Sequence, residues 1–371
     1  MRNAIVCGLG FVGALVLAAP ALAQEAPDVH AGYGPGDAGT IGARETRTPT
    51  VRVTTLDVIG QILYDSNVSG GNSDLAAAKG LKPADEIFAP SVNLNIVRPV
   101  GREVVFLQAS AGYDFYRVNS ILNRERIDLR GGVSGRVAAC NATVTGDYDR
   151  FQSNLGDLSR LAVKNTVDHE SIGLDGSCGR PIGLAPTFSV NQNWTANSSL
   201  QQSFSNSNST TASGGLAYRR PTFGSLSVFG QYTTTTYPNR GNLIGFPGIS
   251  SGYTSWAGGL RFERRLGARI QADATLSYTS LSPDIAGTGG FKGLTYSGDI
   301  TYRASRRLSG NLDFQRGPVP SNRLNSLYSL NQSLGAAVSY EAGPRVTLRL
   351  GASYVTEGYG GGLPSHFLEL T

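Results

Sequence analysis

Apolar and polar residues alternate along most of the chain. From position 270 to 279, Ile, Ala, Ala, Leu and Tyr alternate with Gln, Asp, Thr, Ser and Thr. The same period of two returns over 127–137, 294–303 and 346–354. Because successive side chains of a strand point to opposite faces, this period predicts β-strands with one apolar and one polar face. The sequence therefore predicts an all-β protein.

Turn signals group these strands into hairpins. Short signals such as 99–102, 265–267 and 343–345 recur at intervals of roughly 40 residues, and each interval holds two strands. Longer polar segments, such as 154–167 and 238–250, separate the strands at their other ends. Short turns at one end, long loops at the other and strands of about 10 to 14 residues predict a transmembrane antiparallel β-barrel of about 16 strands. A β-propeller is the alternative, but its strands are shorter and buried on both faces.

Aromatic residues gather near the ends of the predicted strands. At a bilayer surface such residues form two girdles, one at each interface. The predicted girdle on the short-turn side contains Tyr218, Phe262, Tyr302 and Tyr340, and the one on the loop side contains Tyr113, Tyr148, Tyr232 and Tyr278.

The composition agrees with this architecture. Only 16% of the residues are charged, whereas soluble domains have about 25%. Glycine occupies 48 of the 371 positions, about twice its usual share of roughly 7%. Beyond the N-terminus, the chain has no apolar run of the roughly 18 residues that a membrane-spanning helix needs. These features argue against a soluble helical enzyme and exclude a helical multi-span membrane protein.

The N-terminus has the order of a secretory signal peptide. Arg2 precedes an apolar stretch from Ala4 to Ala19, and small residues precede a cleavage position after Ala23. We therefore predict a signal peptide over 1–23, a flexible periplasmic lead segment over 24–50 and the barrel over 51–371. A retained membrane anchor is the alternative for the apolar stretch. Export and the barrel pattern together predict the cell outer membrane as the location.

Two cysteines remain after cleavage, Cys140 and Cys178. An even number suits an oxidising compartment. The two cysteines lie on the apolar faces of neighbouring predicted strands, both at the short-turn end. This arrangement permits a disulfide across the hairpin. Two free thiols are the alternative, and Cα atoms more than about 7 Å apart would exclude the bond.

Residues that could carry catalysis are sparse. The histidines His30, His169 and His366 are scattered and lack the spacing of metal ligands. Ser171 shares a predicted strand face with His169, but serine is abundant and an ordinary strand-end histidine is the simpler interpretation. Glycine pairs occur without the strand and helix of a nucleotide-binding loop. The sequence thus predicts no enzyme activity, no cofactor, no metal and no nucleic-acid partner.

The polar face carries the functional hypothesis. Charged side chains are costly against lipid and inexpensive in a water-filled lumen. They have two interpretations, as salt bridges that hold the strands in register or as a selective lining for a saccharide or ionic solute. The predicted lining residues are Arg126, Asp128, Arg130, Arg136, Asp147, Asp149, Arg261, Glu263, Asp273, Asp299, Arg303 and Arg349.

A short motif ends the first predicted strand. Tyr64, Asp65, Ser66, Asn67 and Val68 lead into a polar loop. This segment resembles the motif at the start of the outer-membrane β-barrel porins associated with exopolysaccharide gene clusters of Gram-negative bacteria. The resemblance implies a porin-like conduit or accessory protein in exopolysaccharide export, and it brings no catalytic residues. Its implied partners are outer-membrane lipid, polysaccharide and periplasmic export components.

Two other functions remain open at this point. A general diffusion porin for small solutes has the same architecture. An outer-membrane lipid hydrolase would require a Ser–His pair. The oligomeric state and the transported substrate have no signal in the sequence.

The last predicted strand, 363–371, departs from the pattern. It begins with Leu363 and Pro364, and it ends in Thr371 rather than in an aromatic residue. We therefore expect an atypical or truncated closing strand. An open sheet edge in a bilayer is costly, because its backbone groups lack partners.

Overall fold

The computed structural model describes residues 52–68, 73–153, 165–179, 182–240, 251–266, 269–285, 288–320, 326–343 and 346–362. The predicted signal peptide, the lead segment and the closing strand over 363–371 lie outside these residues.

Fifteen antiparallel strands make up most of the described chain. The first eight are β1 (Val53–Asp65), β2 (Asp85–Val100), β3 (Glu103–Tyr116), β4 (Arg124–Val137), β5 (Cys140–Gln152), β6 (Thr166–Cys178), β7 (Gly183–Asn197) and β8 (Ser207–Arg220). The other seven are β9 (Gly224–Thr236), β10 (Gly252–Leu266), β11 (Ile270–Pro283), β12 (Phe291–Arg303), β13 (Leu308–Pro320), β14 (Ser326–Gly343) and β15 (Val346–Gly362).

Each strand pairs with its neighbours in sequence, so the sheet order runs from β1 to β15 without a crossover. Within the described ranges, no pairing joins β15 back to β1. The predicted all-β antiparallel barrel architecture is confirmed. Fifteen of the roughly sixteen expected strands are described, and the closing strand expected over 363–371 lies outside the described residues.

The connections differ between the two edges of the sheet. Those that follow β2, β4, β6, β8, β10, β12 and β14 are short and lie at one edge, as predicted. Gly101 turns the chain after β2 with a φ of +64°, a conformation that glycine adopts without steric cost. Gly224 opens β9 with a φ of +100°, and a Cβ at this position would lie 2.3 Å from the Glu263 carbonyl oxygen.

The connections at the other edge are longer and contain the helical turns. These are α1 (Ser73–Ala78) after β1, the 3₁₀ turn η1 (Ser120–Leu122) after β3 and the 3₁₀ turn η2 (Leu200–Ser205) after β7. None of the helices in the described ranges is both long and apolar enough to span a membrane. We call this edge the loop end and the opposite edge the short-turn end.

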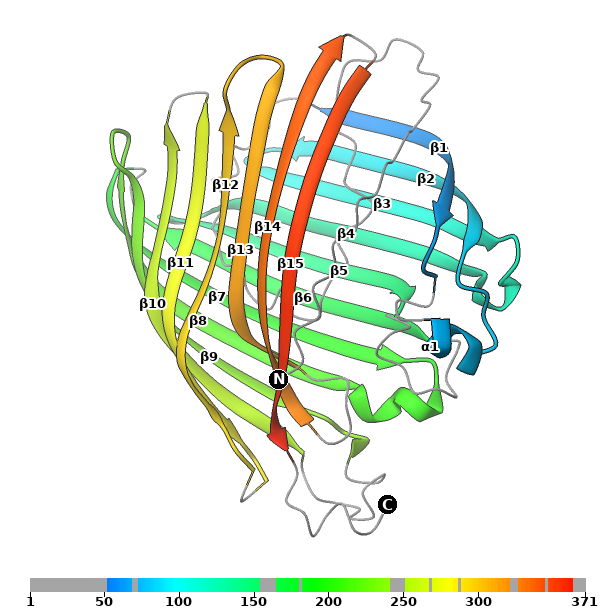
Figure 1. Ribbon diagram of the computed structural model, residues 1–371. Coiled ribbons are helices and arrows are strands. Elements are labelled where there is room, and N and C mark those ends of the chain that lie inside the picture. Colours follow the sequence, from blue (N-terminus) through cyan, green and yellow to red (C-terminus); the bar gives the residue numbers. More distant parts are fainter. Residues whose placement is uncertain are drawn as a thin grey trace.

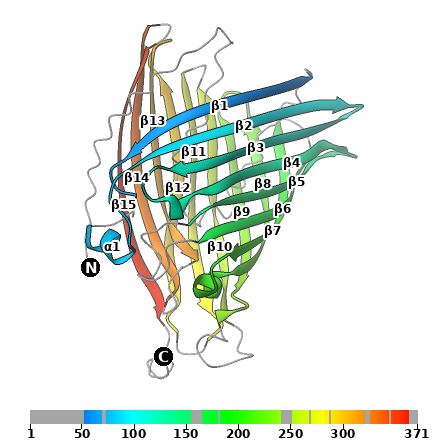
Figure 2. The ribbon, with the colours of Figure 1, turned by 90° about the vertical axis from the view of Figure 1, so that its right-hand side faces the viewer.

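The sheet is strongly curled. In Figure 1 the strands β10 to β15 pass in front of the earlier strands and run in a clearly different direction. Figure 2, turned by 90°, shows β1 to β7 on the near side with the later strands behind them. The accumulated twist between neighbouring strands produces this curl and gives the sheet a concave and a convex face.

Candidate conduit on the concave face

The strand register sorts the side chains onto two chemically different faces. On one face large apolar side chains are open, and Val58 and Leu350 are 78% and 70% exposed. On the other face small polar side chains are crowded, and Thr211 and Ser329 are only 2% and 1% exposed. Curling a sheet crowds the side chains of its concave face and separates those of its convex face. The polar face is therefore concave and the apolar face convex.

This distribution of polarity is the inverse of that in a water-soluble protein. Apolar side chains such as Val133, Val144 and Leu174, which lie opposite one another on β4, β5 and β6, form a continuous exposed belt. Such a large apolar surface suits hydrocarbon and is a liability in water. With the up-and-down strand order, it defines the class of transmembrane outer-membrane β-barrels. The predicted location in the outer membrane follows from this class.

All twelve predicted lining residues fall on the concave face by their register. On β4 and β5, for example, Asp128 lies opposite Asp149, and Arg130 lies opposite Asp147. Arg349 lies opposite Ser339 at the C-terminal side of the sheet. Whether these residues line an open pore stays a prediction.

Arginine–carboxylate pairs connect the strands on this face near the N-terminal side. Arg126 Nε lies 2.8 Å from Asp114 Oδ1, and Arg130 Nε lies 3.3 Å from Asp147 Oδ1. Both pairs join neighbouring strands. These ion pairs support the interpretation of the charges on this face as salt bridges that hold the strands in register.

A row of carboxylates crosses four neighbouring strands further along the sheet. Glu263, Asp273, Asp299 and Asp313 lie opposite one another on β10, β11, β12 and β13. Arg261 contacts two of them, with Nε 2.8 Å from Glu263 Oε1 and Nη2 2.7 Å from Asp273 Oδ2. Like charges directly opposite one another destabilise a sheet. Four carboxylates in one row are compatible with a water-filled interior, because solvent screens the repulsion between them.

Between these charged regions the concave face is neutral and rich in hydroxyl groups. Ser189 Oγ and Ser213 Oγ lie 2.8 Å apart across β7 and β8, and Thr211 Oγ1 and Thr233 Oγ1 lie 3.0 Å apart across β8 and β9. Hydroxyl groups on β11 and β12 form the same kind of pair. Each hydroxyl can both donate and accept, so this wall can exchange hydrogen bonds with an uncharged polar solute.

A buried arginine ties three connections together at the loop end. Arg240, which follows β9, is fully buried at 0% exposure. Its Nε donates to the carbonyl oxygen of Phe204 in η2 at 3.4 Å, and its Nη1 donates to that of Ser326 at the start of β14 at 3.1 Å. The guanidinium carbon lies 3.9 Å from the centre of the Tyr237 ring, and Tyr237 Oη donates to the Leu327 carbonyl at 3.2 Å. We call these five residues the loop-end clasp.

The clasp sits on an apolar cluster. Tyr237, Tyr253, Leu281, Leu327 and Tyr328 pack together, and Phe291 lies against them. Burial lowers the pKa of the Arg240 guanidinium, and the nearby tyrosines oppose this change. The group still carries its charge because the pKa of arginine starts so high. The clasp therefore brings η2, the segment after β9 and the start of β14 together at one end of the concave face.

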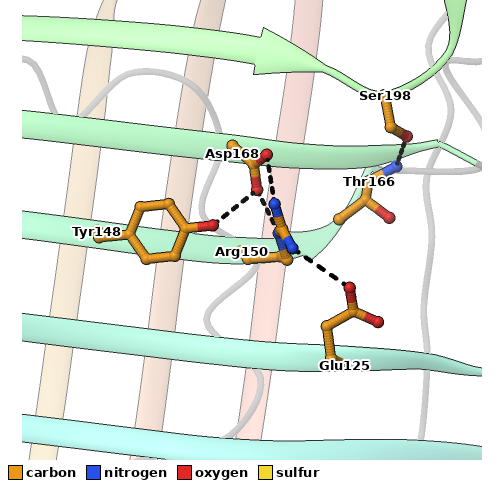
Figure 3. Close-up of polar contacts among 6 residues, drawn as sticks. All are labelled: Glu125, Tyr148, Arg150, Thr166, Asp168 and Ser198. Carbon is orange, nitrogen blue, oxygen red and sulfur yellow. Dashed lines mark hydrogen bonds and ion pairs between the residues drawn. The ribbon is translucent and has the colours of Figure 1, made fainter.

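A second polar network lies on the convex face, also at the loop end (Figure 3). Arg150 donates from Nε and Nη2 to the two carboxylate oxygens of Asp168 at 2.5 and 2.8 Å. Its Nη1 lies 3.4 Å from Glu125 Oε1, and Tyr148 Oη donates to Asp168 Oδ1 at 3.3 Å. Charged and aromatic side chains are typical of the level where hydrocarbon meets headgroups. The network therefore marks the loop-end boundary of the apolar belt around β4 to β6.

The predicted girdle residues share this convex face. Tyr148 lies opposite Leu129, and Tyr218 lies opposite Leu226, both among exposed apolar side chains. Tyr232 and Trp256 face each other across β9 and β10, with ring centres 4.5 Å apart.

Cys140 and Cys178 lie directly opposite each other on β5 and β6 and form a disulfide. Their Cα atoms are 3.9 Å apart, below the limit of about 7 Å that the sequence analysis set. The bond lies at the short-turn end of the convex face and closes the β5–β6 hairpin opposite its long connection.

We expect removal of this disulfide to lower the stability of the folded barrel. The bond joins residues 38 positions apart. Replacing both cysteines with serine should cost about 2 to 4 kcal/mol, because the unfolded chain regains the freedom of that loop. Urea unfolding of the C140S/C178S variant and of the oxidised parent protein in detergent measures the difference. Equal midpoints would contradict the expectation, and the reduced parent protein is the control for the serine side chains.

The weak hydrolase candidate is not assembled. Ser171 Oγ donates to Asp147 Oδ2 at 3.0 Å, whereas His169 Nδ1 lies 3.3 Å from Thr195 Oγ1 on the next strand. Each residue thus has a different partner, and the pair needed for a nucleophilic serine is missing from this part of the concave face. In the described ranges, no group of three or more His, Cys, Asp or Glu residues has the geometry of a metal site.

The motif at 64–68 has a structural role in this chain. Asp65 Oδ1 accepts the backbone N–H of Asn67 at 2.8 Å, which turns the chain at the end of β1. Val68 then packs against Leu81 and Leu122 in a small buried cluster. We call these three residues the loop-end cap.

Sequence analysis did not find the clasp, the Arg150 network or the cap. The Arg150 network could be recognised in the sequence, because a charged residue stands there on the apolar face of a predicted strand, next to a predicted loop. Arg240 has no such signal, because its partners are backbone carbonyls of segments that are distant in sequence.

No family model matches the sequence, and the comparison with curated proteins finds no relative. Among solved structures, the chain is similar to a BenF-like porin of Pseudomonas fluorescens, with 9% identity, a TM-score of 0.36, and coverage of 84% of this chain and 95% of the porin. It is also similar to the outer membrane protein OpdK of Pseudomonas aeruginosa, with 10% identity, a TM-score of 0.36, and coverage of 83% and 94%.

Siderophore receptors are similar over a smaller part of their length. The ferric preacinetobactin receptor BauA of Acinetobacter baumannii has 10% identity and a TM-score of 0.40, and the match covers 82% of this chain and 54% of the receptor. The chain thus spans about half the length of the siderophore receptors it matches.

Proposed function

We propose that the protein is a porin-like conduit of the outer membrane that serves exopolysaccharide export. The concave face supports the conduit: hydroxyl, amide and charged side chains cover it, while the apolar belt occupies the convex face. Half-buried hydroxyl groups of this face, such as those of Ser213 and Thr233, can exchange hydrogen bonds with a polyhydroxylated chain. The export role is supported by the resemblance carried by residues 64–68. Polysaccharide and periplasmic export components are the partners this function implies.

A general diffusion porin is the second candidate. Its support is the mixed sign and mutual pairing of the lumenal charges, as in Arg130–Asp147 and Arg261–Asp273, which gives no strong preference for one ion. The two candidates differ in how the protein treats polymers. A diffusion porin passes small sugars and ignores oligosaccharides, whereas an export conduit binds oligosaccharides and passes them.

Reconstitution tests the proposal. The purified full-length protein is placed in planar bilayers and in liposomes loaded with sugars of increasing length. We expect ion conductance, oligosaccharide efflux and reversible current block by oligosaccharides. Conductance without block would favour the diffusion porin, and neither conductance nor efflux would contradict a conduit. Glycosyltransferase and polymerase genes beside the coding gene would favour export, and their absence would weaken it.

The paired arginines give a prediction about ion selectivity. Replacing Arg126, Arg130 and Arg261 with glutamine leaves their carboxylate partners unpaired and removes three positive charges from the concave face. The reversal potential under a salt gradient should then move toward cation selectivity, because the remaining carboxylates dominate the internal field. Arg102→Gln, in the exposed turn after β2, is the matched control and should cause no shift. An unchanged potential in the triple variant would show that these arginines lie outside the ion path.

A further inference from the structure

Arg124 is the first residue of β4 and lies on the concave face at the loop end, opposite Asp114 of β3. Only 2% of the residue is exposed. None of its guanidinium nitrogens, Nε, Nη1 or Nη2, has a hydrogen-bond partner in the structure. The position combines a buried positive charge with five unused N–H donors.

Arg124 forms no ion pair among the described residues, although the Asp114 carboxylate faces it across the two strands. The guanidinium carbon lies 5.5 Å from the centre of the Tyr116 ring. The facing carboxylate of Asp114 is held by Arg126, whose Nε lies 2.8 Å from Asp114 Oδ1. Two guanidinium groups thus share one carboxylate at this end of β3 and β4.

The other carboxylates of this corner already have donors. Asp65 accepts the backbone N–H of Asn67 at 2.8 Å. Asp85 accepts the backbone N–H groups of Val118 at 3.0 Å and Asn119 at 2.7 Å. None of these carboxylates is hydrogen-bonded to Arg124.

A buried charge without hydrogen bonds destabilises the folded protein. Binding of an anion, or exposure of the group to water, relieves this destabilisation. The planar guanidinium matches the two oxygens of a carboxylate or phosphate group. We propose that Arg124 is the core of an anion-binding site at the loop-end mouth, for a carboxylate or phosphate group of a solute. This inference deepens the proposed conduit by naming an acidic group on its solute.

Tyr116 packs against both Arg124 and the loop-end cap of Val68, Leu81 and Leu122. Because only 2% of Arg124 is exposed, a solute group must displace the side chains packed over it to reach the guanidinium. Binding then replaces an unsatisfied buried charge with a bonded one.

Ligand-induced stabilisation tests the site without any need for transport. The full-length protein is unfolded in detergent with urea in the absence and presence of sodium glucuronate, inorganic phosphate or neutral glucose. A ligand that binds the folded state raises the midpoint. We expect both anions, or the one whose geometry fits, to stabilise the parent protein, and glucose to have no effect; the comparison of glucuronate with phosphate distinguishes the two sources of the anionic group.

Two variants separate binding from structure. Arg124→Met keeps the apolar stem and removes the charge, so we expect anion affinity to fall about tenfold or more, as loss of a charge-assisted hydrogen bond implies. Without anion, its urea midpoint should equal or exceed that of the parent protein, because an unpaired buried charge has been removed. Arg117→Met, in the exposed ion pair with Glu86 at the same end of the sheet, is the control and should keep the anion effect.

The outcomes are distinct from those of the conduit test. Equal anion stabilisation of the parent protein and the Arg124→Met variant, or none in either, would overturn the site. A lower midpoint of Arg124→Met without anion would show a purely structural arginine and would also overturn it. Conductance of the same preparations reports separately on the conduit, so failure of one proposal leaves the other measurable.

Discussion

Substitution of Val144 by arginine should prevent stable insertion of the barrel, whereas the same change at Thr145 should be tolerated. Val144 lies on the convex face of β5 between Val133 and Leu174, in the middle of the apolar belt. An arginine near the midplane of the lipid face of a barrel costs about 2 to 4 kcal/mol. The urea midpoint in lipid vesicles and the heat-modifiable migration of the folded protein on gels measure this loss.

Thr145 is the matched control because it is the next residue and points to the concave face. It lies opposite Gly132 and Gly173 and is half-buried, so a polar side chain at this position extends toward the polar interior instead of the lipid. We expect Thr145→Arg to change the midpoint by less than about 1 kcal/mol, as substitutions at wet positions usually do. If the two variants were equally stable, or if Thr145→Arg were the worse one, the assignment of the faces would be wrong.

The second large effect is expected from Arg240→Met at the loop-end clasp. The change removes the donors to the carbonyl oxygens of Phe204 and Ser326 and leaves these buried acceptors without their partner. Hydrogen bonds to charged groups contribute about 1.5 to 3 kcal/mol each, so the clasp should open. We expect higher conductance, larger current fluctuations and faster proteolysis of the connections after β7, β9 and β13.

Arg117→Met is the control for this variant. Arg117 is also at the loop end, but its pair with Glu86 is exposed, at 2.6 Å between Nη1 and Oε2. Exposed ion pairs contribute about 0 to 1 kcal/mol, so conductance and proteolysis should stay close to the parent values. Unchanged conductance in Arg240→Met, together with faster proteolysis, would show that the clasp holds the loops without closing the conduit.

The alternating pattern of the sequence is sufficient to predict the strands, their order and the two faces. Alternation over 127–137 and 270–279 assigns each residue to a face, because the side-chain period of a strand is two. Neighbouring segments then pair as hairpins, and the pairing of β5 with β6 across their long connection places Cys140 opposite Cys178. The concave position of Arg130 and Asp147 follows from the same parity. These features depend on residues close in sequence, so local pattern is sufficient for them.

Contacts between groups that are distant in sequence become visible only in the folded sheet. Arg240 contacts Phe204 and Ser326, and the second of these is 86 residues away. The acceptors are backbone carbonyls, which every residue has, so no residue type in the sequence marks them. For Arg124, the alternation predicts that the side chain lies on the concave face. It does not predict that the facing carboxylate, Asp114, is already paired with Arg126. Alternation determines the face to which a side chain points. Its partners depend on the curvature of the sheet and the packing of the loops, and these exist only when the whole sheet has folded.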